Sequence, residues 1–223
     1  MKHIFNTIFC FFCLFISLNA QWVKQLVATS STASAVTTDV NGNIFITGYF
    51  GGSGSSGVQF DGSTTIWNTG GIDAFVAKYN SIGEFQWANK IGGLKSDAGY
   101  DITTDVNGNV YVIGSFDDSV DFDSTTSLTN FGFDDIFIAK YNSIGEFQWA
   151  NKIGSSSNWD IGYAIASDAN KNIYVTGFFN GTANFDSVTT LTAHGLADAF
   201  LAKYNSDGEL QWVNKIGGTD SDS

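Results

Sequence analysis

The sequence predicts an all-β protein assembled from repeated four-stranded units, and two observations support this prediction. The first is a repeat: the stretch AKYNSIGEFQWANKIG occurs identically at 77–92 and 139–154, and returns as AKYNSDGELQWVNKIG at 202–217. The second is the hydrophobic pattern, which either alternates with a period of two or is continuously apolar over about eight residues, as in strands. A sustained repeat indicates a repeat architecture.

The spacing of recurring residues sets the size of the unit. Successive tryptophans lie 65, 62 and 63 residues apart, at Trp22, Trp87, Trp149 and Trp212. Bounding the units at these tryptophans gives repeat 1 at 22–86, repeat 2 at 87–148, repeat 3 at 149–211 and the start of a truncated repeat 4 at 212–223, within a mature chain of 21–223.

Each unit is predicted to contain four strands, and the second shows them clearly. Residues 99–105 alternate polar and apolar side chains, 109–116 and 135–142 are apolar on both faces, and 146–153 alternate again. Asn107-Gly108 between the first two strands is a strong hairpin signal. Four strands in meander order, with the polar strands innermost and outermost, are typical of a β-propeller blade.

The chain supplies about three such blades, whereas propellers close with about four to eight. We therefore expect an incomplete ring, and interpret the sequence as a fragment of a longer reading frame. The alternative is a natural three-blade protein that closes by self-association. Between the second and third strands of each unit lies a variable insert, at 51–71, 117–134 and 180–198, where binding would be expected to differ.

The recurring motifs resemble a known family. The pattern D-x-N-G-N-[IV]-[FY]-[IV]-x-G, then F-D, then D-[AI]-F-[VIL]-A-K-Y-N-x-x-G-E-[FL]-Q-W and a closing K-I-G is similar to the SBBP family of bacterial β-propeller repeats, over 22–218. The resemblance implies a secreted or surface-associated propeller, usually part of a longer protein. It implies no catalytic residues. The third unit departs at Asn170-Lys171, and because lysine disfavours positive φ we expect a different turn there.

Residues 1–20 are predicted to be a signal peptide, with a short basic start, an apolar run and a small residue, Ala20, before Gln21. An uncleaved N-terminal anchor is the alternative. Both cysteines lie inside the apolar run, so the mature chain contains no disulfide and its hydrophobic core must hold the fold. The predicted location is secreted or at the cell surface, with no membrane span after removal of the signal.

The formal net charge of −12 makes nucleic acid a poor partner, since an acidic surface repels phosphate. The expected partners are an extracellular polysaccharide or another surface protein, together with further blades. Cofactors are not expected, except calcium. Its candidate ligands are the acids of the second insert, Asp117, Asp118, Asp121 and Asp123, because hard cations need converging carboxylates. A solvated acidic loop is the simpler interpretation of that cluster.

Other recurring polar residues are interpreted as structural. Asp39, Asp105 and Asp168 have D-x-N-x-N spacing, which suits either a calcium loop or an aspartate that accepts backbone N–H groups across its own hairpin, and the second interpretation is favoured. A lysine recurs mid-strand, and each copy needs an acid or carbonyl partner: Lys78, Lys140 and Lys203. The acids five positions earlier are Asp73, Asp135 and Asp198. We interpret these sets, and the recurring tryptophans, as contacts between blades.

The sequence contains few residues suited to catalysis, since His194 is the one histidine after the predicted signal peptide and no nucleophile motif is present. The non-recurring Trp67 and Trp159 could form a sugar platform, although partial burial explains them equally. The sequence therefore predicts a binding or scaffolding module without a reaction of its own. The alternative is part of an extracellular carbohydrate-active enzyme whose active site needs blades absent from this sequence.

Overall fold

The computed structural model describes residues 27–219, apart from 29, 53 and 157–158. The predicted signal peptide, Trp22 and the end of repeat 4 lie outside the described residues. Every regular element within the described residues is a strand, and most strands form three four-stranded units in chain order. The second and third units are joined into one eight-stranded sheet by the pairing of Gly154 and Ser155 with Asn184 and Ala183. The predicted all-β propeller fold is confirmed.

Each unit is a blade with its strands in meander order. Blade 1 consists of β2 (Ser31–Thr38), β3 (Ile44–Gly51), β6 (Ile72–Tyr79) and β7 (Phe85–Ile91). Blade 2 consists of β8 (Asp97–Thr104), β9 (Val110–Phe116), β12 (Asp135–Tyr141) and β13 (Phe147–Ser155). Blade 3 consists of β14 (Ile161–Ser167), β15 (Ile173–Asn184), β16 (Thr190–Tyr204) and β17 (Leu210–Ile216).

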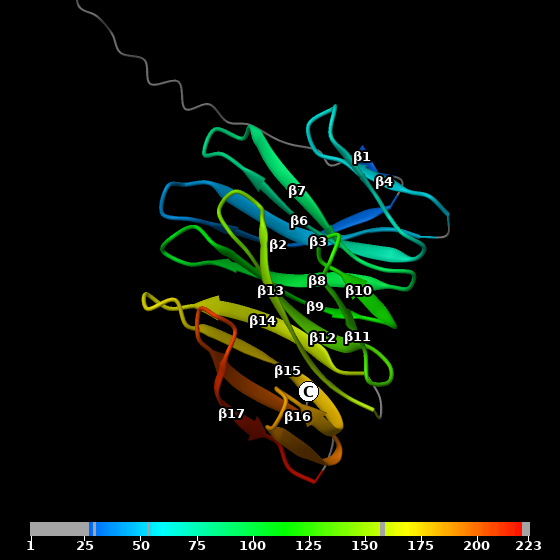
Figure 1. The fold of residues 1–223 in the computed structure, drawn as a ribbon, viewed down its shortest axis with the longest axis vertical. Helices are drawn as coiled ribbons and strands as arrows, with labels where there is room; N and C mark the ends of the chain where they lie inside the picture. Colours follow the sequence, from blue (N-terminus) through cyan, green and yellow to red (C-terminus); the bar gives the residue numbers. More distant parts are fainter. Residues whose placement is uncertain (1–26, 29, 53, 157–158, 220–223) are drawn as a thin grey trace, which may run out of the picture.

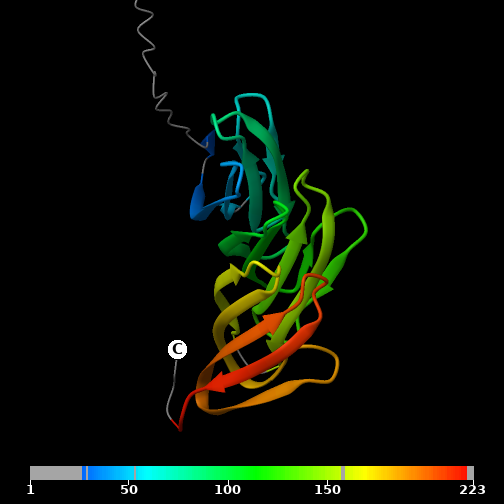
Figure 2. The ribbon, with the colours of Figure 1, turned by 90° about the vertical axis from the view of Figure 1, so that its left-hand side faces the viewer.

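The blades follow one another along a curved stack, from blue to red in Figure 1, and the side view in Figure 2 shows the curvature. The first strands of the blades lie side by side, with β8 between β2 and β14. They are tied by hydrogen bonds: the Thr104 hydroxyl donates to the Thr38 carbonyl at 3.1 Å, and the Ser167 hydroxyl donates to the Thr104 carbonyl at 2.7 Å. The half-polar strands are therefore the inner strands, as the alternation predicts.

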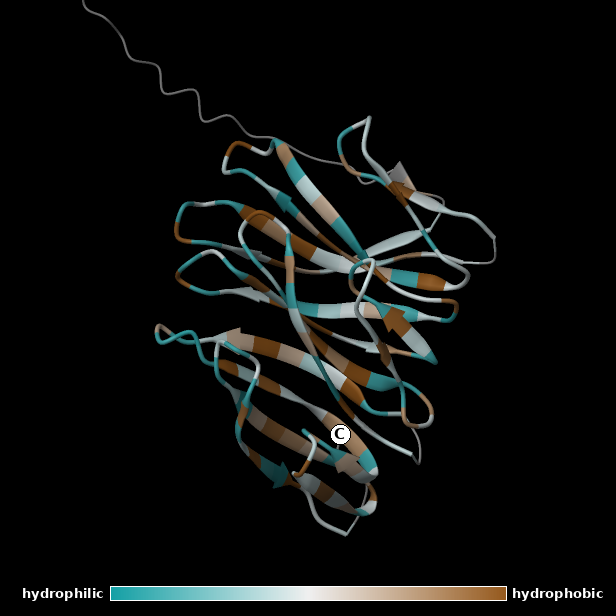
Figure 3. Ribbon diagram, viewed as in Figure 1, coloured by the Kyte–Doolittle hydropathy of each residue, from teal (hydrophilic) through white to brown (hydrophobic). Residues whose placement is uncertain are grey.

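The hydrophobic core lies between the blades. All seven residues of β9 are buried, as expected for a strand with packed neighbours on both faces. The core between blades 1 and 2 joins Phe45 and Val76 of one blade to Val112 and Phe137 of the next. In Figure 3 the hydrophobic residues appear as brown bands along the strands of the blades. Because each blade buries a face against its neighbour, the apolar pattern recurs in every unit.

The variable inserts form hairpins, an arrangement that the sequence analysis did not anticipate. In blade 1 the hairpin is β4 (Gly57–Gln59) with β5 (Thr65–Trp67), and β1 (Val27–Ala28) pairs with β4. In blade 2 it is β10 (Ser119–Asp121) with β11 (Ser127–Thr129), and in blade 3 it extends β15 and β16. The chain leaving one blade pairs with the next insert, as in Gly92 with Asp121 and Gly154 with Asn184. These pairings link successive blades.

The prediction of a different turn at Asn170-Lys171 is wrong. Lys171 has a φ of 65° and its N–H donates to the Asp168 carbonyl at 2.9 Å. The equivalent Gly108 has a φ of 75° and donates to the Asp105 carbonyl at 2.9 Å. The Asp168 carboxylate also accepts the N–H groups of Asn170 and Asn172, at 2.8 and 2.9 Å. These bonds hold the same turn although lysine disfavours the left-handed region.

Candidate functional site

The recurring polar residues join each blade to the next, and the junction of blades 2 and 3 shows how. The Lys140 ammonium and the Trp149 indole N–H both donate to the Ser206 carbonyl, at 2.7 and 3.1 Å. The Asn151 amide donates to the Gly208 carbonyl at 2.6 Å. All three donors belong to blade 2 and both acceptors belong to the outer turn of blade 3.

The same three bonds recur between blades 1 and 2. Lys78 and Trp87 donate to the Ser143 carbonyl at 2.8 and 3.4 Å, and Asn89 donates to the Gly145 carbonyl at 2.7 Å. A Cβ atom on Gly145 would lie 2.8 Å from the Trp87 ring, and Gly145 has a φ of 88°. Glycine is therefore required twice over, for its conformation and for its close contact with the indole. The prediction that these lysines and tryptophans join blades is confirmed at both junctions.

Blade 3 carries the same donors, Lys203, Trp212 and Asn214, on a face that no described residue covers. Lys203 lies over the Tyr174 ring at 5.4 Å and the Trp212 ring lies 6.2 Å from it, and within the described part of the chain none of the three residues donates a side-chain hydrogen bond to a neighbouring blade. Trp212 is 38% exposed. These three residues therefore provide a natural control for the junction contacts.

The prediction that the recurring aspartates join blades is wrong, because each pairs with a lysine on the next strand of its own blade. Asp73 pairs with Lys90 at 3.4 Å, and Asp135 and Asp198 pair with Lys152 at 3.9 Å and Lys215 at 3.1 Å. Residues five apart on one strand point to opposite faces, so Asp73 cannot reach Lys78. Lys90 lies opposite Phe75 on the neighbouring strand, diagonally across from Asp73.

These aspartates are completely buried, and burial is the largest influence on the pKa of Asp73 and Asp135. Burial raises the pKa of Asp73 to about 6 and that of Asp135 to about 7, although backbone N–H groups and the lysines oppose the shift. At Asp198 burial also raises the pKa, but the His194 N–H and Lys215 together outweigh it and the pKa lies below the usual value. We interpret all three as structural, because their bonds hold the base of each insert.

The aspartates of the hairpin turns are also structural. The Asp105 carboxylate accepts the N–H groups of Asn107 and Asn109 at 2.8 and 3.0 Å, the Asn109 amide at 2.8 Å and the Tyr111 hydroxyl at 3.0 Å. Asp39 accepts the corresponding bonds from Asn41 and Asn43, at 2.9 and 2.9 Å. The favoured interpretation, a carboxylate that holds its own turn, accounts for these residues.

The four candidate calcium ligands are only partly brought together. Asp121 and Asp123 line one shallow cavity at the tip of the second insert, and the Asp123 carboxylate accepts the N–H of Thr125 at 2.8 Å and that of Thr126 at 2.6 Å. Asp117 and Asp118 lie at the base of the hairpin, where the Asp118 carbonyl accepts the Asn130 N–H at 2.8 Å. Within the described residues no group of three acidic, histidine or cysteine side chains is placed to hold a metal ion.

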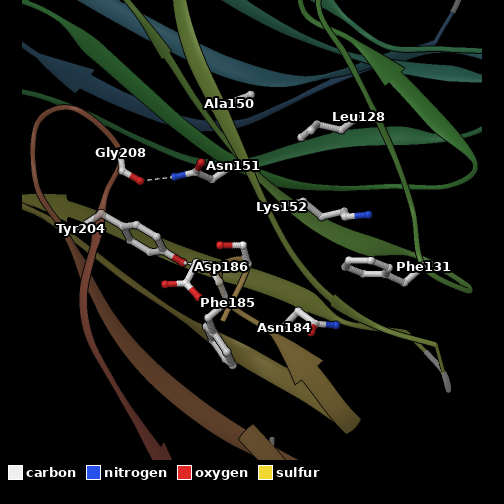
Figure 4. Close-up of a pocket in the computed structure, with 11 residues that line it drawn as sticks. Leu128, Phe131, Ala150, Asn151, Lys152, Asn184, Phe185, Asp186, Tyr204 and Gly208 are labelled. Carbon is white, nitrogen blue, oxygen red and sulfur yellow. Dashed lines mark hydrogen bonds between the residues drawn. The ribbon is translucent and has the colours of Figure 1, made fainter. Parts of the chain in front are cut away.

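A groove of about 310 Å³ lies between blades 2 and 3 on the outer side of the stack (Figure 4). Asn151 and Gly208 form its wall through their hydrogen bond, and the Lys152 ammonium lies 3.2 Å from the centre of the Phe131 ring. Most of its lining recurs at the preceding junction; Asn89 and Lys90, for example, take the places of Asn151 and Lys152. Phe131 differs, since Thr69 occupies its position in blade 1.

The positions that differ between blades carry exposed apolar side chains. Trp67 in the first insert and Trp159 before β14 are 58% and 57% exposed. Phe131 and Phe133 end the second insert at 47% and 55%, and Leu196 takes the place of Phe133 in blade 3 at 76% exposure. The recurring lysines, tryptophans and asparagines at the two junctions bond between blades, whereas these side chains are available to a ligand.

The comparisons with known proteins agree with the architecture. A family model described as the SBBP beta-propeller repeat matches residues 21–49. The chain carries an SBBP-type β-propeller repeat. An uncharacterised WD repeat-containing protein, L264 of Acanthamoeba polyphaga mimivirus, is 31% identical over 213 residues, which cover 82% of this chain and 15% of the viral protein. The regulatory protein FlaEY of Caulobacter vibrioides is 26% identical over 165 residues, or 69% of this chain and 17% of that protein.

The chain thus spans less than a fifth of the length of these two relatives. A crystal structure of a protein of unknown function from Bacteroides caccae aligns over 87% of this chain and 86% of its own, at 11% identity and a TM-score of 0.30, which is too low to support an argument. The β-propeller repeat, together with the similarity to a WD repeat-containing protein, indicates a binding or scaffolding module. Within the described residues no helix is long and apolar enough to cross a membrane.

Two sets of residues were missed in the sequence. Asn89 and Asn151 bond between blades, and their recurrence in the W-x-N motif was the available signal. Asp97 and Asp160 are buried at the start of their inner strands. They occupy equivalent positions, but the surrounding residues differ so much between repeats that the pattern does not reveal them.

Proposed function

We propose that this chain is a secreted binding module without catalysis, in which the recurring residues build a rigid arc of blades and the inserts bind an extracellular polysaccharide or surface protein. The observation that supports it most is the division between the two kinds of position. Lysine, tryptophan and asparagine at recurring positions are committed to bonds between blades. The exposed side chains of Trp67, Phe131 and Phe133 lie at positions that differ from blade to blade.

The chemistry of the inserts suits recognition of neutral or cationic surfaces. Trp67, Phe131 and Phe133 offer aromatic faces that stack on sugar rings or pack on apolar protein side chains. The surrounding surface is acidic, since the whole chain has a formal net charge of −12. Acidic polysaccharides are therefore poor candidates, and neutral glycans or basic proteins are better ones.

Secretion and binding are tested separately. Expression of the full chain in a bacterial host should release a protein that begins at Gln21; a product in the medium or at the surface with Met1 intact contradicts signal cleavage. The mature chain is then applied to immobilised neutral glycans and to surface-protein extracts, with products analysed for hydrolysis.

The binding variant replaces Trp67, Phe131 and Phe133 by serine, and is expected to lose about tenfold or more in affinity, because such aromatic contacts dominate interfaces. The control replaces Ile82 and Ile144, which are equally exposed at 67% and 68% but occupy a recurring turn. Equal losses in both variants contradict binding by the inserts. Hydrolysis of a bound glycan contradicts the absence of catalysis.

A further inference from the structure

The two end blades of the arc carry the two complementary halves of a blade junction. At both internal junctions the earlier blade supplies lysine, tryptophan and asparagine donors, and the later blade supplies carbonyls of its outer turn. Blade 3 presents the same donors, Lys203, Trp212 and Asn214, on its open face. Blade 1, at the other end of the stack in Figure 1, presents an outer turn at 80–84. The chain thus contains both partners of one further junction.

The outer turn of blade 1 already has the conformation that accepts these donors. Its sequence, NSIGE at 80–84, is identical to that of 142–146, the turn that accepts the donors of blade 1. In both turns the N–H of the first residue donates to the carbonyl of the fifth at 2.9 Å. Gly83 has a φ of 81°, close to the 88° of Gly145. The carbonyls of Ser81 and Gly83 are therefore preformed acceptors, and no hydrogen bond to either is found within the described residues.

An apolar hollow lies on blade 3, beside its inner strand. It has a volume of about 180 Å³, and its lining includes Tyr174, Thr176 and Leu201. The residues at the same positions of blade 2 are fully buried and share a core cluster with blade 3: Tyr111, Ile113 and Ile138. The hollow therefore belongs to the face that a following blade covers at the internal junctions.

Val36 of β2 is the side chain that matches this hollow. The inner strands of the next two blades carry Ile102 and Ile165 at the same position, and these are 4% and 6% exposed. Each belongs to the core cluster that its blade shares with the preceding one. Val36 is 66% exposed, because no described residue packs over this face of blade 1. Its position is the one that fills the space between blades at both internal junctions.

Two features limit the strength of a contact between the end blades. At the internal junctions the chain leaving the earlier blade pairs with the next insert, as Gly92 does with Asp121. In blade 1 this place is taken by β1, since Val27 pairs with Gln59. A second copy must therefore meet blade 1 at its outer turn and inner strand, away from β1. The formal net charge of −12 also makes two copies repel each other, so the contact should be weak and dependent on concentration.

We propose that the chain associates head to tail with a second copy of itself, with blade 3 of one copy against blade 1 of the other. Lys203 and Trp212 donate to the Ser81 carbonyl of the second copy, and Asn214 donates to its Gly83 carbonyl. The exposed valine of the second copy fills the hollow. Two copies, with three blades each, supply a number of blades within the range of about four to eight at which propellers close, so a closed pair is expected.

Sedimentation equilibrium of the mature chain measures this association, from micromolar to near-millimolar concentration and at low and high salt. The dilute chain at low salt is expected to be a monomer. The average mass should rise with concentration towards that of two copies, and more readily at high salt, because ions screen the repulsion. The Trp212 indole N–H, which is open to solvent in the monomer, should exchange more slowly as the mass rises. The contact uses recurring positions, so it does not depend on the function proposed for the inserts.

Two variants each disable one half of the contact. Val36→Asp places a charge where the hollow must be filled, and Asn214→Asp replaces the amide donor by a carboxylate that faces a carbonyl. Both positions are exposed in the single chain, so both variants should fold. Each variant alone should need a concentration about tenfold higher or more to associate. Mixed together they should associate again, because one copy keeps an intact blade 3 and the other an intact blade 1.

The matched control is Val188→Asp, the same substitution at a position that is 85% exposed in the third insert; it should associate as the wild type does. Circular dichroism establishes that each variant is folded. The proposal is overturned if the wild type keeps the mass of one copy at every concentration and salt, or if either end variant associates as the wild type does. It is also overturned if the mixture associates no more than its components, or if Val188→Asp weakens association as much as Val36→Asp.

Discussion

Replacing Asn151 by alanine removes one bond between blades 2 and 3 and leaves the Gly208 carbonyl, which it contacts at 2.6 Å, without its partner. A hydrogen bond contributes about 0.5–1.5 kcal/mol net, and an orphaned buried carbonyl costs about 1–3 kcal/mol. Because the bond is only partly buried and water can reach the carbonyl in part, we expect a loss of about 1–2 kcal/mol in the free energy of unfolding.

The chain itself supplies the control. Asn214 holds the same repeat position in blade 3 and is exposed, with no acceptor among the described residues, so Asn214→Ala should change stability by less than about 0.5 kcal/mol. Asn89→Ala at the first junction should resemble Asn151→Ala, since its bond to the Gly145 carbonyl measures 2.7 Å.

Urea denaturation followed by tryptophan fluorescence measures these differences, and thermal melting should show a fall of roughly 2–8 °C for Asn151→Ala. Because each blade contacts only its neighbours, amide exchange should increase chiefly in the blades that flank the altered junction. If Asn214→Ala destabilises the protein as much as Asn151→Ala, the asparagine acts within its own strand and the reasoning on blade junctions is refuted.

Three further predictions concern protonation, backbone strain and calcium. The pKa values of Asp97 and Asp135 are raised to about 8 and about 7, so the folded state holds their protons more tightly than the unfolded chain, and their contribution to stability falls as pH rises from about 4 to 8. In urea titrations between pH 6 and 8, the Asp97→Asn variant should therefore lose less stability than the wild type. An equal loss of stability in both proteins contradicts the raised pKa of Asp97. Lys171→Gly should raise the free energy of unfolding by about 0.5–1 kcal/mol, because glycine adopts the positive φ of 65° without strain, whereas Lys171→Ala should not raise it. If Lys171→Gly is no more stable than the wild type, the backbone at this position is not strained. The melting temperature should be the same in a chelator and in millimolar calcium. Calcium takes about six to eight oxygen ligands, and the described structure brings only Asp121 and Asp123 of the four candidate ligands to one cavity. A melting temperature that is higher by more than a few degrees in calcium contradicts this prediction.

The fold could be predicted from the sequence because every blade packs against its neighbours through the same pattern of apolar residues. Identical residues at 77–92 and 139–154 build the same outer hairpin, and the period-two pattern separates inner strands from buried ones. The partners of charged residues were harder to assign. Asp73 and Lys78 are close in sequence but point to opposite faces of β6, and only the strand pairing reveals that Lys90 is the partner.

A cavity of about 250 Å³ between blades 1 and 2, whose lining includes Ala98 and Ser115, could not be predicted from the repeat. It depends on positions where the repeats differ, Ala98 and Ser115 in place of Ile161 and Phe178, and nothing in the sequence shows that these positions face each other across two strands. The sequence also does not show that both oxygens of Asp160 accept hydrogen bonds whereas one oxygen of Asp97 does not, because the two positions carry the same residue type. Residues that recur in every repeat can be assigned a structural role from the sequence. The contacts between residues that differ from repeat to repeat can be assigned only from the three-dimensional structure.

The most direct test of the central claim, that the recurring residues join one blade to the next, is the hydrogen exchange of the tryptophan indole N–H groups, measured by NMR and assigned by single Trp→Phe variants. The indoles of Trp87 and Trp149 donate across the two junctions at 3.4 and 3.1 Å, and Trp212 has no such acceptor among the described residues. We predict slow exchange at Trp87 and Trp149 and fast exchange at Trp212. Equal exchange rates at all three would contradict the account.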